Sequence, residues 1–141
     1  SLVGSEMCIR DRSDSIFTKI IKGEIPCYKI AEDDRFIAFL DVFPIKKGHT
    51  LVVPKVQIDY VFDLDDSLLS DLMIFAKKVA LKMQRAISCE RIGIAVIGLE
   101  VPHAHIHLVP LDTVGDIDFS QPKLQLSAKE MTEIADSIRI N

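Results

Sequence analysis

The spacing of apolar and polar residues along the chain predicts five β-strands and three helices. Short apolar or alternating runs, bounded by proline, glycine or acidic pairs, predict strands over residues 28–32, 35–41, 50–53, 91–97 and 103–110. Helical spacing predicts a short helix over residues 16–21, which Ser13 and Asp14 can cap, and a last helix over about 127–139, which begins with a capping-box sequence. This order of elements predicts an α+β fold with a mainly antiparallel sheet.

The longest predicted helix begins at Asp65 or Asp66 and ends near Ile87. Its apolar stripe is wider than contact with a single sheet needs. The pattern leaves two interpretations open: a helix that is well buried within its own domain, or a helix that also meets a second subunit. The stripe contains Leu68, Leu69, Leu72, Met73, Phe75, Ala76, Val79, Ala80 and Met83.

The composition is typical of one globular domain. The chain has 141 residues, of which 48% are hydrophobic and 27% charged, with a formal net charge of −4. The acidic balance argues against nucleic acid as a partner. No apolar run approaches the ~20 residues of a transmembrane helix, so we expect no membrane partner. The three cysteines are scattered, which argues against a disulfide framework and makes a reducing cytoplasm the expected compartment.

The first twelve residues differ in character from the rest of the chain. They show no clear periodicity and no helix cap, so we expect residues 1–12 to be a disordered or artefactual extension. A genuine flexible tail would have the same composition. We expect residues 13–141 to form a single domain.

The most informative segment runs from Pro102 to Pro110. Three of the four histidines in the chain, His103, His105 and His107, stand at every second position and are separated by apolar residues. Successive side chains of a β-strand point to opposite faces of the sheet. The three imidazoles are therefore predicted to share one face, with the apolar residues on the other.

Three imidazoles on one strand face suit two kinds of chemistry. The first is metal binding, since zinc accepts imidazole ligands. Neighbouring side chains on one face lie about 6.6 Å apart and the outer pair about 13 Å apart, so one ion with bonds of about 2.1 Å can bridge two of them but hardly all three. The second is nucleophilic attack on phosphorus by a central imidazole whose neighbours donate to phosphate oxygens.

The segment His103-Ala104-His105-Ile106-His107-Leu108-Val109 resembles the His-φ-His-φ-His-φ-φ motif of the histidine-triad (HIT) family, in which φ is apolar. Residues 15–26 are similar to the family's opening helix, and residues 36–41 and 48–55 to its two mid-chain signatures. The match covers roughly residues 15–110. It implies a single HIT domain with about five antiparallel strands and a two-fold homodimer, which favours the interface interpretation of the long helix.

The chain most resembles the Hint-like branch, whose members hydrolyse adenosine 5′-phosphoramidates and related nucleotides. The resemblance implies that His105 is the nucleophile that becomes nucleotidylated. It also implies that His103 and His107 orient this nucleophile and contact the α-phosphate. His49 is expected to support the histidine cluster.

The resemblance also implies a binding site for a purine nucleotide. Asp41 would accept hydrogen bonds from the ribose hydroxyls, although its place at a strand end also suits a simple turn residue. The expected nucleobase wall consists of residues that could each be ordinary core: Phe17, Ile16, Ile20, Phe39 and Val42.

The chain departs from the family pattern in two places well before the triad. Some bacterial relatives carry a Cys-x-x-Cys pair in the opening helix and bind structural zinc. Ser15 and Thr18 stand at those positions here, so we expect no zinc and no other cofactor. The family's usual basic or histidine residue after Pro54-Lys55 is replaced by Val56-Gln57.

A third departure lies just before the triad. The family usually has an asparagine followed by a Gly-Gln-Ser/Thr segment that contacts phosphate, whereas residues 97–102 read Ile-Gly-Leu-Glu-Val-Pro. A carboxylate at Glu100 would repel a phosphate. A regular strand from Glu100 onward would send its side chain to the face opposite the histidines. Alternatively, Glu100 recognises a cationic leaving group such as an amine.

The sequence thus predicts a HIT-family hydrolase or transferase that cleaves the α-phosphate bond of adenosine 5′-phosphoramidates or related nucleotides through a nucleotidyl-histidine intermediate. The alternatives are a nucleotide-binding protein with little turnover, a dinucleoside polyphosphate hydrolase and a metal-binding protein.

Overall fold

A computed structural model describes residues 13–140, and the expectation for residues 1–12 falls outside this part of the chain. The helices are α2 (Ile16–Ile21), α3 (Asp66–Ala86) and α4 (Ala128–Ile138), and the strands are β1 (Lys29–Glu32), β2 (Phe36–Leu40), β3 (Thr50–Pro54), β4 (Arg91–Ala95) and β5 (Ile106–Leu111). Two short 3₁₀ helices, η1 (Val61–Asp63) and η2 (Val114–Ile117), lie in the connections. Among these residues, no helix combines the length and the apolar character that crossing a bilayer requires.

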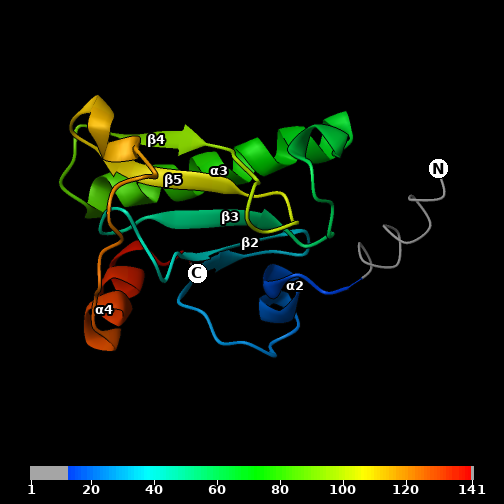
Figure 1. The fold of residues 1–141 in the computed structure, drawn as a ribbon, viewed down its shortest axis with the longest axis horizontal. Coiled ribbons are helices and arrows are strands. Elements are labelled where there is room, and N and C mark those ends of the chain that lie inside the picture. Colours follow the sequence, from blue (N-terminus) through cyan, green and yellow to red (C-terminus); the bar gives the residue numbers. More distant parts are fainter. Residues whose placement is uncertain (1–12, 141) are drawn as a thin grey trace.

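The strands form one five-stranded sheet in the order β1-β2-β3-β5-β4, and every neighbouring pair is antiparallel. Figure 1 shows this stack of strands with α3 behind it and α2 and α4 beyond the β2 side. The predicted α+β fold with a five-stranded antiparallel sheet is therefore confirmed. The dimer that the resemblance implied stays a proposal.

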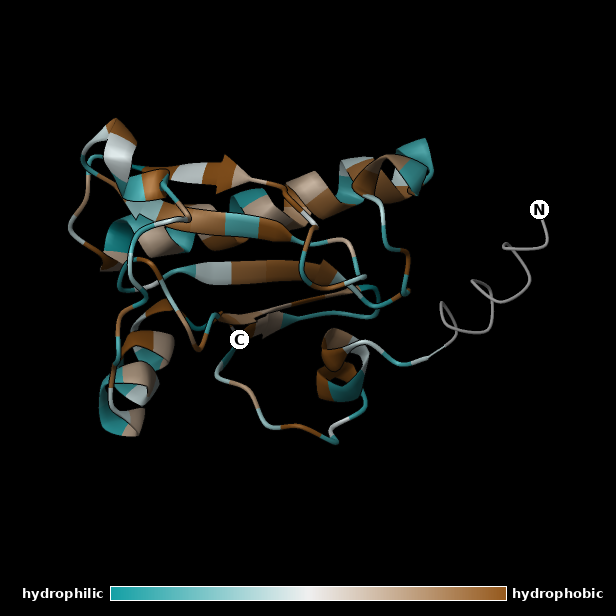
Figure 2. Cartoon of the chain, viewed as in Figure 1, coloured by the Kyte–Doolittle hydropathy of each residue, from teal (hydrophilic) through white to brown (hydrophobic). Residues whose placement is uncertain are grey.

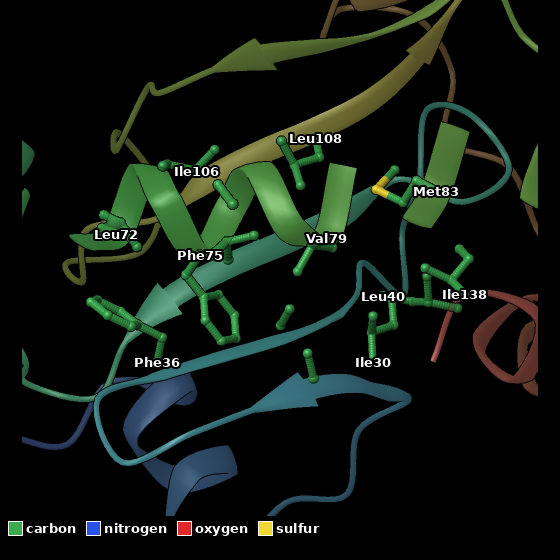
Figure 3. Close-up of a cluster of buried hydrophobic side chains, with 14 of the residues drawn as sticks. Ile30, Phe36, Leu40, Leu72, Phe75, Val79, Met83, Ile106, Leu108 and Ile138 are labelled. Carbon is green, nitrogen blue, oxygen red and sulfur yellow. The ribbon is translucent and has the colours of Figure 1, made fainter. Parts of the chain in front are cut away.

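Both faces of the central strands are covered, so β2 and β3 are buried along their whole length. The larger hydrophobic cluster lies on the face that packs against α3 and α4 (Figure 3). A smaller cluster on the other face includes Phe17 from α2 with Ile37, Phe39, Leu51 and Val53 from the sheet. Figure 2 shows how hydrophobic residues concentrate along the strands while the helices carry both kinds.

The long helix buries only part of its apolar stripe. The Asp65 side chain caps it by accepting from the Leu68 N–H at 2.8 Å. The core-facing residues, spaced by three or four positions, are Leu72, Phe75, Ala76, Val79 and Met83. Met73, Ile74 and Leu81 are 43%, 53% and 46% exposed, so apolar surface remains uncovered on this helix.

Three expectations about element ends were wrong. Helix α2 is capped by Ser15, whose hydroxyl accepts from the Thr18 N–H, and not by Ser13 or Asp14. The strand expected from residue 103 begins at Ile106, because the Ala104 N–H donates to the Ile58 carbonyl outside the sheet. That strand also continues through Pro110, which pairs only with β4 because the pairing with β3 ends at Leu108. A proline is tolerated in such a place, since a strand position with a neighbour on one side only behaves as an edge position.

Candidate active site

The apolar residues of the histidine motif lie on one face of the sheet, and its imidazoles lie on the other. Ala104, Ile106 and Leu108 are buried in the cluster under α3. The rings of His103 and His105 contact Phe17 of α2 on the opposite face, at centroid distances of 5.7 and 4.9 Å. The His105 and His107 ring centroids are 4.8 Å apart. The predicted separation of imidazoles from apolar residues is therefore confirmed, although the segment 103–105 is not a regular strand.

The central histidine is held in one tautomer by the backbone. Nδ1 of His105 lies 2.8 Å from the His103 carbonyl oxygen, which can only accept a hydrogen bond. Nδ1 therefore carries the proton, and the lone pair of the neutral ring is on Nε2. Within residues 13–140, no hydrogen bond occupies Nε2 of His105. This nitrogen is the available nucleophile.

A second chain of hydrogen bonds fixes His107 through His49. The Ile45 N–H donates to Nδ1 of His49 at 3.2 Å, so this nitrogen carries no proton. Nε2 of His49 is then the protonated nitrogen and donates to Nδ1 of His107 at 2.9 Å. The proton of His107 consequently lies on Nε2. The site thus places a lone pair on His105 beside an N–H donor on His107.

Burial keeps the histidine rings neutral. It lowers the pKa of His49 to about 4 and the pKa of His107 to about 3. Burial also lowers the pKa of His103 and of His105, although the bond to the His103 carbonyl and the charges of Asp41 and Glu100 oppose the shift at His105. A neutral imidazole with a depressed pKa retains its nucleophilic lone pair at neutral pH.

His103 is wholly buried, and both of its ring nitrogens are hydrogen-bonded within the protein. Nε2 donates to the Pro54 carbonyl at 2.7 Å, so Nδ1 must accept, and the Ser15 hydroxyl donates to it at 2.7 Å. The resemblance implied that His103 contacts the α-phosphate. That contact stays a prediction, and it would require one of these two ring nitrogens to give up its present hydrogen bond. His103 holds its own carbonyl in place for His105.

Residues that the sequence reasoning did not assign extend this arrangement into α2. The Thr18 hydroxyl donates to Oε1 of Gln57 at 2.6 Å, and the Ser15 N–H donates to the same oxygen at 2.8 Å. The Gln57 amide nitrogen donates to the Ser13 carbonyl at 2.7 Å. The Ser-x-x-Thr spacing, which puts both hydroxyls on one side of a short helix, was the available signal. Its partner Gln57 is 39 residues or more away in sequence.

Asp41 lies beside the histidines, and the five expected nucleobase-wall residues fall into two groups. One Asp41 carboxylate oxygen accepts from the Phe43 N–H at 2.8 Å, and the other lies 3.6 Å from Nε2 of His49. Phe17 and Phe39 are buried and meet edge to face at 5.7 Å. Ile16 and Val42 are about half exposed, at 49% and 55%, and Ile20 is partly buried against the Phe17 cluster.

Two sets of side chains could be considered for a metal ion. Asp41, His49 and His107 offer ligand atoms within 4.8 Å of one another. However, the Ile45 N–H occupies Nδ1 of His49, so a metal at Nε2 would have to displace the ring's only proton and form an imidazolate. The cluster around His103 offers a single nitrogen with hydroxyl and amide oxygens, whereas zinc prefers thiolate and imidazole. Neither set suits zinc in this protonation state.

The segment before the triad, residues 97–102, contains one charged side chain, Glu100, and no neutral side chain that can donate a hydrogen bond. Gly98 has φ of +73°, and Leu99 is 88% exposed. Glu100 is exposed, and its charge raises the pKa of His105. Because the strand begins only at Ile106, the alternation expected from Glu100 onward does not apply.

An aromatic residue from the C-terminal part of the chain also lies against the histidines. The Phe119 ring meets the His107 ring at 4.7 Å and the His49 ring at 5.8 Å, edge-on in both cases. Sequence reasoning missed Phe119, because a single aromatic residue in an acidic loop has no distinctive pattern.

Comparison with known proteins gives this site a family. A family model described as the HIT domain matches residues 22–114. The chain belongs to the histidine-triad (HIT) family. It is 35% identical over 91% of its length to an uncharacterised HIT-like protein of Borreliella burgdorferi, of which it covers 98%. It is also 38% identical, over 67% of its length and 72% of the relative, to the adenosine 5′-monophosphoramidase of Schizosaccharomyces pombe.

Solved structures agree with this assignment. A HIT-like protein of Bartonella henselae, described as involved in cell-cycle regulation, superposes with a TM-score of 0.77 at 29% identity, covering 89% of this chain and 94% of that one. The family model begins at residue 22 and ends at residue 114, so α2 and the segment that carries Phe119 lie outside the matched region, although both contact the histidines.

Proposed function

We propose that this HIT protein is a hydrolase or transferase that cleaves the bond between the α-phosphate and the leaving group of adenosine 5′-phosphoramidates or related purine nucleotides. The observation that carries the proposal is the backbone bond from Nδ1 of His105 to the His103 carbonyl, which leaves Nε2 as a nucleophile. The similarity to a phosphoramidase of Schizosaccharomyces pombe supports the substrate class.

The reaction proceeds in two displacements. In the first, Nε2 of His105 attacks the α-phosphorus and forms a P–N bond, while the P–N bond to the leaving amine breaks. The amine leaves with the bonding electron pair and takes a proton from solvent. In the second, water attacks phosphorus, the bond to Nε2 breaks with its electron pair returning to the ring, and the water loses a proton. One water is consumed for each amine and nucleoside monophosphate released.

The surrounding groups have distinct roles in these steps. The ring of His105 becomes positively charged when it is nucleotidylated, and the His103 carbonyl stabilises that charge through Nδ1–H. His107 donates Nε2–H to a non-bridging phosphate oxygen, with its ring oriented by His49. Asp41 accepts from the ribose hydroxyls, and the base packs against Ile16, Ile20 and Val42, with Phe17 and Phe39 behind them.

The experiment compares wild type with His105→Ala, using an adenosine 5′-phosphoramidate and a dinucleoside polyphosphate as substrates. We expect wild-type turnover that is lost in His105→Ala, with AMP binding retained. Faster turnover of the dinucleoside polyphosphate would indicate that the protein is a dinucleoside polyphosphate hydrolase instead. Unchanged turnover in His105→Ala would overturn the mechanism.

One observation favours a second candidate, a nucleotide-binding protein with little turnover. Residues 97–102 contain no asparagine, glutamine, serine or threonine, and they carry the carboxylate of Glu100. Fewer donors at the phosphate would weaken stabilisation of the transition state more than binding of the nucleoside. Tight AMP binding with no turnover of either substrate would support this alternative.

We also propose that two copies pair through α3 and β4. Strand β4 is an edge of the sheet, and its Ile94 and the following Val96 are 48% and 42% exposed. With the exposed Met73 and Ile74 of α3, they are the apolar residues that we assign to the interface of the dimer that the HIT family resemblance implies.

A further inference from the structure

Phe119 is held against the histidines by anchors on both sides of it. Before it, Asp116 forms an ion pair with Lys46 at 3.0 Å. After it, the Leu124 N–H donates to the Pro44 carbonyl at 2.7 Å. Both partners belong to the loop that leads to His49. The segment 116–124 is therefore fixed over one side of the histidine cluster.

Lys123 folds back onto this aromatic ring. Its ammonium lies 5.8 Å from the Phe119 ring centroid and donates to the Phe119 carbonyl at 3.1 Å. These partners are uncharged, and among residues 13–140 Lys123 forms no ion pair with a carboxylate. Its charge nevertheless reaches the site, because it lowers the pKa of both His49 and His107. A cation that is held near the phosphate donor and not neutralised is available to an anionic ligand.

We propose that Lys123 binds a non-bridging oxygen of the substrate's phosphoryl group, and that Phe119 positions it there. This inference rests on the proposed function of the same site. It resolves a difficulty in that proposal, because the segment before the triad lacks neutral donors. The cation that recognises phosphate comes instead from a segment beyond the matched HIT domain, on the His107 side of the cluster.

Three charged side chains act on the histidine rings, and only one of them is positive. Asp41 raises the pKa of His105 and His107 and Glu100 raises that of His105, whereas Lys123 lowers the pKa of His49 and His107. A phosphoryl oxygen is repelled by the two carboxylates and attracted by Lys123, so Lys123 is the one of these three side chains that can bind it.

The test measures binding of AMP and of adenosine by calorimetry for wild type, Lys123→Met, Lys123→Arg and Lys129→Met. Lys129 is an exposed lysine of α4, so its variant is the matched control for loss of one positive charge. We expect Lys123→Met to weaken AMP binding about tenfold and to leave adenosine binding unchanged. Lys123→Arg should retain most of the affinity, and Lys129→Met all of it. The salt dependence of AMP binding should also be shallower in Lys123→Met.

The outcomes separate this inference from the function on which it rests. Wild-type AMP affinity in Lys123→Met, or an equal loss with AMP and adenosine, overturns the role of Lys123 while leaving His105 turnover intact. Weaker AMP binding in Lys123→Met in a protein without turnover supports the phosphate contact and overturns only the hydrolase. If the wild-type protein does not bind AMP, both the role of Lys123 and the proposed function are overturned.

Discussion

Removing the Ser15 hydroxyl tests whether His103 is held as described. Ser15→Ala removes the cap of α2, which costs about 1 kcal/mol on its own. It also removes the donor at 2.7 Å from Nδ1 of His103, a fully buried ring. Only the Thr18 hydroxyl at 3.4 Å remains near this nitrogen, and it donates to Gln57, so the poorly satisfied acceptor costs about 1–3 kcal/mol more. We therefore expect the free energy of unfolding to fall by about 2–4 kcal/mol.

The chain offers a matched control for this variant. Ser127 caps α4 with nearly the same backbone conformation as Ser15 but bonds only its own helix, so Ser127→Ala should cost about 1 kcal/mol. Urea unfolding of both variants, read by far-UV circular dichroism, measures the difference directly. Equal losses would refute the claim that Ser15 satisfies His103. Turnover of Ser15→Ala provides a second measurement. Because the His103 carbonyl orients the nucleophile, kcat should fall by a larger factor than the factor by which KM changes.

The remaining predictions concern pH, a glycine and the proposed dimer. Because burial lowers the folded-state pKa of His49 to about 4, the unfolded chain protonates first. The stability present above pH 6.5 is thus lost as the pH falls, by about 2 kcal/mol between pH 7 and pH 5 for His49 alone; a flat profile in urea unfolding would contradict this. Gly48 has φ of +89°, and an added Cβ would lie 2.3 Å from Ile87, whereas Gly23 has φ of +80° and open space. In thermal melts, Gly48→Ala should therefore cost more than the ~1–2 kcal/mol of strain expected for Gly23→Ala. Sedimentation should give twice the 15.8 kDa monomer mass for wild type and the monomer mass for Ile74→Glu; a monomeric wild type would end the dimer proposal.

The alternation of residues 103–108 was enough to predict where the imidazoles lie. It depends only on the local period of the backbone, and it survives although the regular strand begins at Ile106. The tautomers could not be predicted, because they are set by the carbonyls of His103 and Pro54 and by the Ile45 N–H. Of these, only the His103 carbonyl belongs to the motif itself.

The residues that surround the triad show the same limit. The sequence marked Ser15 and Thr18 as replacements for cysteines, but their partner Gln57 became meaningful only when the fold brought the loop after β3 to α2. Phe119 and Lys123 follow the matched domain in a loop without periodicity. Their position depends on the anchors to Pro44 and Lys46, which no pattern in the sequence connects to them.

The most direct test of the central claim is the mass of the protein itself during turnover. Wild-type protein mixed with an adenosine 5′-phosphoramidate is quenched within the first turnover in alkaline denaturant, and its intact mass is measured. We predict an increase of one adenylyl group, located by peptide mapping on His105 and absent in His105→Ala. An adduct on another residue, or rapid turnover in His105→Ala, would contradict the assignment of His105 as the nucleophile.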